Sequence, residues 1–162
     1  MRGVAVSAMT GLGNQRLSRS KPVLGISCST AVKLDFDGVS FKTVKYWALR
    51  TMRWFRLGGF VILKSSEGNY HVVFNRRVTW KRNVKIMSWV AVMSQLPKLK
   101  DYVLMQCIKG CSTLRVSRKG DKPSPRIVYR YGKQDGEVRN FLLKRRQIWR
   151  ILRRMENGED LS

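Results

Sequence analysis

The stretch AVKLDFDGVSF, residues 31–41, holds the pattern that decides the fold. Apolar and polar side chains alternate at its start, with Val32, Leu34 and Phe36 set between Lys33, Asp35 and Asp37. Side chains two positions apart in an extended strand point to the same side, so we expect a strand with one apolar and one polar face. Asp35 and Asp37 would then project together from the polar face.

The residues that follow this strand predict further helices and strands. Apolar side chains recur at helical spacing after Ser40, which is a suitable N-cap, and Gly58 and Gly59 would end that helix. Alternating or apolar runs bounded by turn residues predict strands. The later expected elements are strands at 60–64 and 70–74, a helix at about 81–95 ended by Pro97, strands at 102–108, 113–119 and 126–132, and a terminal helix.

This order of elements favours the α+β class, with a mainly antiparallel sheet and helices packed on one face of it. The chain has 162 residues, which is enough for a single domain with its own core. We expect four segments: a flexible basic N-terminal arm (1–24), an α+β core (25–140), a basic amphipathic helix (141–155) and an acidic frayed tail (156–162).

The charge balance indicates a polyanionic partner. Lys and Arg number 33 against 10 Asp and Glu, which gives a formal charge of +23. Basic residues interleave with Trp, Tyr and Phe along most of the chain, and this mixture suits phosphate neutralisation together with base stacking. Nucleic acid is therefore the expected partner. A solvated basic surface or an anionic membrane face would give the same composition.

The sequence also carries indications of the compartment. No apolar run approaches the length that crosses a bilayer, and the N-terminus lacks a secretory core, so we expect no membrane association. The three cysteines are an odd number, which favours reduced thiols in the cytoplasm. The organelle matrix is the alternative, because the N-terminal residues contain Ser and Arg but no acid.

Two features of the polar strand positions suggest a phosphate or metal site. Asp35 and Asp37 on one face would repel each other unless a cation lies between them, and Mg²⁺ or Mn²⁺ accepts such ligands. Neighbouring Lys and Arg side chains would neutralise them equally well. The only histidine, His71, follows the turn SSEGN, whose hydroxyl and N–H groups suit phosphate oxygens. A packed histidine without a chemical role is the plainer interpretation.

An apolar strand ending in Asp-x-Asp, a helix, a strand, and a Gly/Ser turn leading into a strand with histidine resembles the archaeo-eukaryotic primase superfamily. The resemblance covers residues 28–132 and is one of motif order. It implies an RRM-like primase core, single-stranded nucleic acid or template-primer and nucleoside triphosphates as ligands, and a helicase or larger primase subunit as a possible partner. The family usually has a serine two positions before this histidine, and the present sequence has Asn69 there. The implied roles are metal binding by Asp35, Asp37 and Asp101, with His71 also in the catalytic set, and phosphate binding by Ser65, Ser66, His71, Arg115, Ser117 and Lys119.

The expected function is metal-dependent nucleotidyl transfer of the primase or polymerase kind on a single-stranded template. If Asp101 does not reach the site, a degenerate core remains that binds nucleic acid or nucleotide without polymerising. The alternative is therefore a noncatalytic single-stranded DNA- or RNA-binding protein, and the small size suggests a replicon such as a virus or plasmid. The residues expected to contact the template from the basic helix are Lys144, Arg145, Arg146, Arg150, Arg153 and Arg154.

Overall fold

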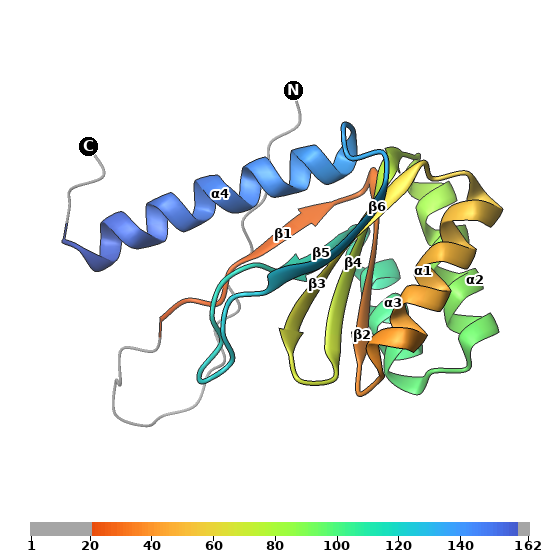
Figure 1. Cartoon of the computed structure of the whole chain (residues 1–162), viewed down its shortest axis with the longest axis horizontal. Helices are drawn as coiled ribbons and strands as arrows, with labels where there is room; N and C mark the ends of the chain where they lie inside the picture. The colour runs from red at the N-terminus through yellow and green to blue at the C-terminus, as the bar shows by residue number, and fades with distance from the viewer. Residues whose placement is uncertain (1–20, 159–162) are drawn as a thin grey trace.

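The computed structural model describes residues 21–158. Figure 1 shows a sheet between one group of helices and a long, separate C-terminal helix. The elements in chain order are β1 (Gly25–Cys28), β2 (Ala31–Asp37), α1 (Phe41–Phe55), β3 (Gly59–Ser66), β4 (Asn69–Arg77), α2 (Trp80–Ser94), α3 (Pro97–Lys109), β5 (Ser112–Arg115), β6 (Arg126–Gly132) and α4 (Glu137–Glu156).

The main sheet has four strands in the order β2-β4-β3-β6, and every neighbouring pair is antiparallel. β1 and β5 form a second antiparallel pair beside β2. Side chains join the two sheets, because the buried Lys33 ammonium donates to the carbonyl oxygens of Ile26 at 2.9 Å and Ser112 at 3.2 Å. The expected α+β class with a mainly antiparallel sheet is confirmed.

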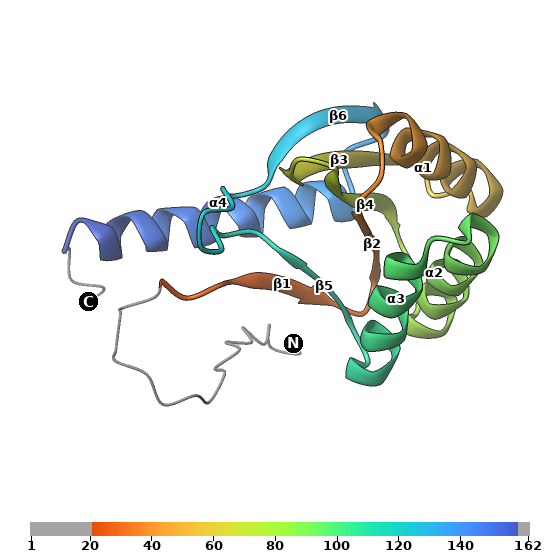
Figure 2. The same ribbon diagram turned by 90° about the horizontal axis from the view of Figure 1, so that it is seen from below.

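The helices cover both faces of the main sheet. α1, α2 and α3 lie on the face that carries Leu34 and Phe36, where they enclose the larger core. α4 lies against the other face, and its Val138 and Phe141 pack with Val61 in a smaller core. Figure 2 shows α4 on the side of the sheet opposite to α1 and α2. Three of the four helices in the described part therefore share the expected face, and α4 covers part of the second.

Local sequence explains where the first two helices begin. The Ser40 hydroxyl accepts from the Thr43 N–H at 3.2 Å, as an N-cap does, and Thr79 plays the same part for α2 through the Arg82 N–H at 3.3 Å. α1 ends at Phe55, ahead of Gly58, whose φ of +77° lets the chain turn back into β3. The Ser40 cap is confirmed.

The strand predicted at 102–108 is wrong, because these residues belong to α3. Pro97 occupies the first turn of this helix, where its missing N–H costs nothing, so it starts a helix as well as following α2. Leu99, Val103 and Gln106 are the buried residues of α3, at helical spacing. A short apolar run does not distinguish a strand from a packed helix by periodicity alone. Asp101 thus lies in a helix and not at the start of a strand.

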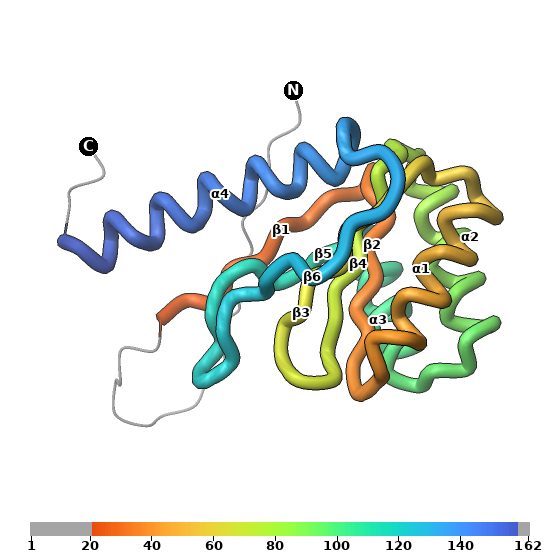
Figure 3. The backbone as a smooth tube through the Cα atoms, viewed as in Figure 1, coloured from red at the N-terminus to blue at the C-terminus, as the bar shows by residue number. Residues whose placement is uncertain are grey.

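Three other boundaries differ from the expectation. β5 runs from 112 to 115 and so covers only 113–115 of the strand predicted at 113–119, and Figure 3 traces the long loop that connects it to β6. α4 begins at Glu137, four residues before the predicted 141. Most of the predicted N-terminal arm, residues 1–20, and residues 159–162 of the predicted tail lie outside the described residues. Within the described part, no helix combines the length and apolar character needed to span a membrane.

Candidate phosphate and nucleic-acid site

Asp35 and His71 face each other across neighbouring strands. They are register partners in the β2–β4 ladder, and Nε2 of His71 lies 3.5 Å from Oδ1 of Asp35. Val73, two residues from His71, packs in the core beneath α4, so the pair lies on the α4 side of the sheet. His71 is 3% exposed, whereas the Asp35 side chain is 29% exposed and has its Oδ1 buried. The face opposite the larger core is thus partly a second apolar core beneath α4, and it brings Asp35 and His71 together.

Burial favours the uncharged form of both partners. Burial and the nearby Asp37 raise the pKa of Asp35 to about 7, against the lowering effect of Arg115, Lys122 and Lys119. Burial, with Arg115, lowers the pKa of His71 to about 3. Near pH 6 the pair thus holds one proton, on the carboxyl group. The buried atoms Oδ1 of Asp35 and Nδ1 of His71 have no hydrogen-bond partner among residues 21–158.

Arg115 supplies a fixed positive charge beside this pair. It is the last residue of β5, and its guanidinium donates to the carbonyl oxygens of Ser65 at 3.2 Å, Pro123 at 2.9 Å and Ser117. Three carbonyl partners from two segments hold the side chain in one position. Its positive charge lowers the pKa of both Asp35 and His71. The predicted phosphate-binding residue Arg115 is therefore part of the same cluster.

The loop after β5 adds two more cations. Backbone hydrogen bonds at 3.0 Å in both directions between Lys119 and Lys122 close a tight turn, in which Gly120 has a φ of +55°. Both lysines are exposed, and their charges lower the pKa of Asp35. Lys119 was predicted from the sequence, whereas Lys122 was not. The sequence RKGDK could have indicated Lys122, because basic residues flank the turn-forming Gly-Asp pair on both sides.

The other predicted phosphate-binding residues have structural contacts. Ser117 is buried, and its hydroxyl accepts from the Leu24 N–H at 2.7 Å, so it anchors the chain before β1. The Ser65 hydroxyl donates to the Asn69 carbonyl at 3.3 Å, and Ser66 accepts from the Asn69 side chain at 2.6 Å. These serines shape the β3–β4 turn. The Ser65 carbonyl also orients Arg115.

The three predicted metal-binding carboxylates do not come together in the described part of the chain. Asp37 is exposed at the end of β2, and its negative charge raises the pKa of Asp35. Asp101 is exposed in the first turns of α3, and residues 21–158 hold no cluster of three His, Cys, Asp or Glu side chains. The structure thus does not bring Asp101 into the site, because the apolar run after it forms a helix. Two carboxylates with substrate phosphates are a donor set that Mg²⁺ accepts.

The basic helix α4 divides into packed and exposed residues. Arg145 is 7% exposed, donates to the Pro125 carbonyl and stacks on Trp149 with its guanidinium 3.9 Å from the ring centroid. It therefore holds the loop against α4, which corrects the expectation that it contacts the template. Lys144 is half-buried. The exposed basic residues of the predicted set are Arg146, Arg150, Arg153 and Arg154.

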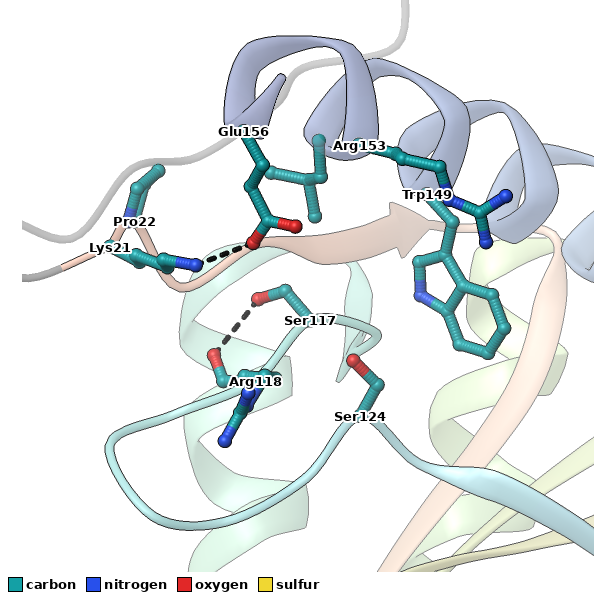
Figure 4. A pocket seen from close by; sticks show the side chains of 9 residues that line it. Lys21, Pro22, Ser117, Arg118, Ser124, Trp149, Arg153 and Glu156 are labelled. Carbon is teal, nitrogen blue, oxygen red and sulfur yellow. Dashed lines mark hydrogen bonds and ion pairs between the residues drawn. The ribbon is translucent and has the colours of Figure 1, made fainter. Parts of the chain in front are cut away.

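A pocket of about 190 Å³ lies between α4 and the loop after β5. Its lining includes Arg118, Arg153 and Trp149, and the Trp149 indole N–H is fixed by the Val116 carbonyl at 2.8 Å. Figure 4 shows Glu156 at this pocket, paired with Lys21 at 2.5 Å. One loop thus carries Arg118, which lines the pocket beside α4, and Lys119 and Lys122, whose charges act on Asp35.

Among the described residues, 21–158, Glu156 is the single carboxylate that lines this pocket. If nucleic acid passes here, Glu156→Gln removes a repulsion and frees Lys21, so affinity for a single-stranded oligonucleotide should rise about two- to threefold at about 50 mM salt. Fluorescence anisotropy measures this change. Asp101→Asn removes the same formal charge from α3, across the sheet, and an equal rise in both variants would show only a net-charge effect.

Comparison of the chain with protein-family models, with curated proteins and with solved structures finds no match.

Proposed function

We propose that this protein binds single-stranded nucleic acid on the α4 side of its sheet, with a phosphate group at the Asp35–His71–Arg115 cluster. The observation that carries the proposal is a set of three cations, Arg115, Lys119 and Lys122, whose charges act on the partly exposed carboxyl group of Asp35 in a chain of formal charge +23. A phosphate beside a protonated Asp35 meets no repulsion. Neutral His71 and the carboxyl proton can each donate a hydrogen bond to it.

The exposed arginines of α4 extend this positive surface. Arg153 and Arg118 line the pocket beside α4, and Arg118 belongs to the same loop as Lys119 and Lys122. A strand that follows the loop would therefore meet cations continuously from β5 to α4. Such contacts are made with the phosphate backbone, so binding should be sensitive to salt and tolerant of sequence.

The direct test replaces the loop lysines. Lys119→Gln/Lys122→Gln should lower affinity for a labelled oligothymidylate about tenfold at low salt and reduce the salt dependence by about two phosphate contacts. Lys98→Gln/Lys100→Gln in α3 is the matched control, because these lysines are also exposed and removal of the same charge leaves the candidate site intact. Equal losses in the two double variants would contradict the proposal.

A second candidate function is nucleotidyl transfer, and the shared strand face of Asp35 and Asp37 favours it. The two carboxylates would hold one Mg²⁺ or Mn²⁺, which supplies charge neutralisation for phosphoryl chemistry when bound. Arg115 and Lys119 would then orient the triphosphate, and His71 would donate to one of its oxygens. This arrangement resembles the primase site that the sequence motifs suggest, with two acids in place of three.

pH separates the two functions. Without metal, phosphate binding should weaken as pH rises through 7, because Asp35 becomes an anion. With Mn²⁺, nucleoside triphosphate binding should strengthen over the same range, because the anion is the metal ligand. Template-directed incorporation of labelled nucleotides that is lost in Asp35→Asn and Asp37→Asn would establish catalysis. Absent incorporation, together with unchanged oligonucleotide binding in both variants, would leave the binding function alone.

A further inference from the structure

A cluster of aromatic and arginine side chains lies on the helical face, on the side of the sheet away from Asp35. Trp54 of α1 is 70% exposed and lies parallel to Trp89 of α2, with an interplanar angle of 11° and ring centroids 6.0 Å apart. Tryptophan is mostly buried in folded proteins, and here one indole face remains open to solvent. We call Tyr46, Leu49, Arg50, Arg53 and Trp54 the α1 stripe. These residues line a groove of about 340 Å³ at the helical spacing of a single face.

Aromatic rings hold Arg50 in place within this stripe. Its guanidinium lies 5.5 Å from the Trp47 ring centroid and 6.0 Å from that of Trp89, and it donates to the Tyr46 hydroxyl at 2.7 Å. A guanidinium held in this way loses little further entropy when it binds an anion. The stripe therefore presents a fixed cation beside the open face of Trp54.

The charge around the stripe is entirely positive. Neither α1 nor α2 contains an acidic residue. Arg82, at the start of α2, donates to the Phe55 carbonyl at 3.0 Å and so brings its charge to the end of α1. A complementary ligand must carry negative charge together with flat apolar groups. Single-stranded nucleic acid has both, with phosphates for the arginines and a base for the indole.

We propose that the α1 stripe is a second contact site for single-stranded nucleic acid, in which a base stacks on Trp54 and the flanking phosphates pair with Arg50 and Arg53. This inference extends the proposed function to the opposite face of the sheet and rests on it. The candidate site on the α4 side would bind phosphate groups through charge, whereas the α1 stripe would add stacking of a base on Trp54. The protein would therefore hold a strand at two places separated by the sheet.

The experiment compares an oligothymidylate of about 12 nucleotides with an abasic oligomer of equal length and charge. The oligothymidylate should quench tryptophan emission of the full chain, and Trp54→Phe should remove most of this quenching while affinity is kept. Trp54→Leu keeps apolar bulk without the indole ring, and should lower oligothymidylate affinity about tenfold but leave abasic binding unchanged. Ile108→Ala in α3 is the matched control, because Ile108 is 71% exposed.

Four results would overturn the inference. Unchanged affinity in Trp54→Leu, with Trp54-independent quenching, would show that no base stacks there, and the stripe would then suit an acidic protein segment. Equal losses with the abasic oligomer would show that contact is ionic only. Absent oligonucleotide binding by the wild type would overturn the proposed function as well. Loss on Lys119→Gln/Lys122→Gln but not on Trp54→Leu would leave the proposed function standing and remove only the second site.

Discussion

Asp35→Asn should make the stability of the protein depend strongly on pH, whereas this site should contribute little pH dependence in the wild type. In the variant, the buried His71 remains, with a folded-state pKa of about 3 against an ordinary value of 6.5. A lowered pKa means that the unfolded chain binds the proton more tightly. The free energy of unfolding should therefore fall by about 3 kcal/mol as pH decreases from 6.5 to 4. Urea denaturation across this range measures the change.

His71→Gln should give the opposite slope. Asp35 then remains, with a folded-state pKa raised to about 7 from 3.8, so its contribution is fully present below pH 4 and is lost as pH rises toward 7. In the wild type the two slopes offset each other, because folded and unfolded chains both hold about one proton on the pair over most of this range. If the free energy of unfolding changed with pH in the same way in the wild type and both variants, this would contradict a buried pair that holds one proton.

The fold was predictable where a strand has two different faces. Alternation in AVKLDFD was sufficient to place Asp35 on the face opposite the larger core. The turn SSEGN before His71 was sufficient to place that residue in a strand. The register that pairs Asp35 with His71 was not predictable, since it depends on the bulge between Ala31 and Lys33 and on the hairpin between β3 and β4. Local pattern fixes the face of a residue, whereas tertiary pairing fixes its neighbour.

The site was less predictable where one residue type serves two purposes. Pro97 ends helices and also begins them, so the segment after it was assigned to a strand, and Asp101 was expected in the site. Lys33 has the same alternation as Asp35, yet it is buried as a hydrogen-bond donor between the two sheets. Arg145 looks like any other cation of α4, but it packs on Trp149. Charge in a sequence does not by itself show whether a side chain meets a ligand or a carbonyl.

Arg115→Ala should affect both stability and binding more than Arg118→Ala, which changes the arginine of the following loop. The guanidinium joins the end of β3 to the loop after β5 through the carbonyl oxygens of Ser65, Pro123 and Ser117. Loss of these partly exposed hydrogen bonds should lower the free energy of unfolding by about 2–3 kcal/mol. It also removes the charge that lowers the pKa of Asp35 most, so this pKa should rise further.

Nucleic-acid affinity should fall about tenfold in Arg115→Ala, because the loop that carries Lys119 and Lys122 loses its anchor. Arg115→Lys should restore little of this, since one ammonium group cannot span three carbonyl oxygens in the geometry of a guanidinium. Arg118→Ala is the control from the same loop. Its side chain is exposed, so it should lose only about threefold in affinity and no stability. Equal effects of Arg115→Ala and Arg118→Ala would reduce Arg115 to an ordinary surface charge, and the phosphate site would then have no fixed cation.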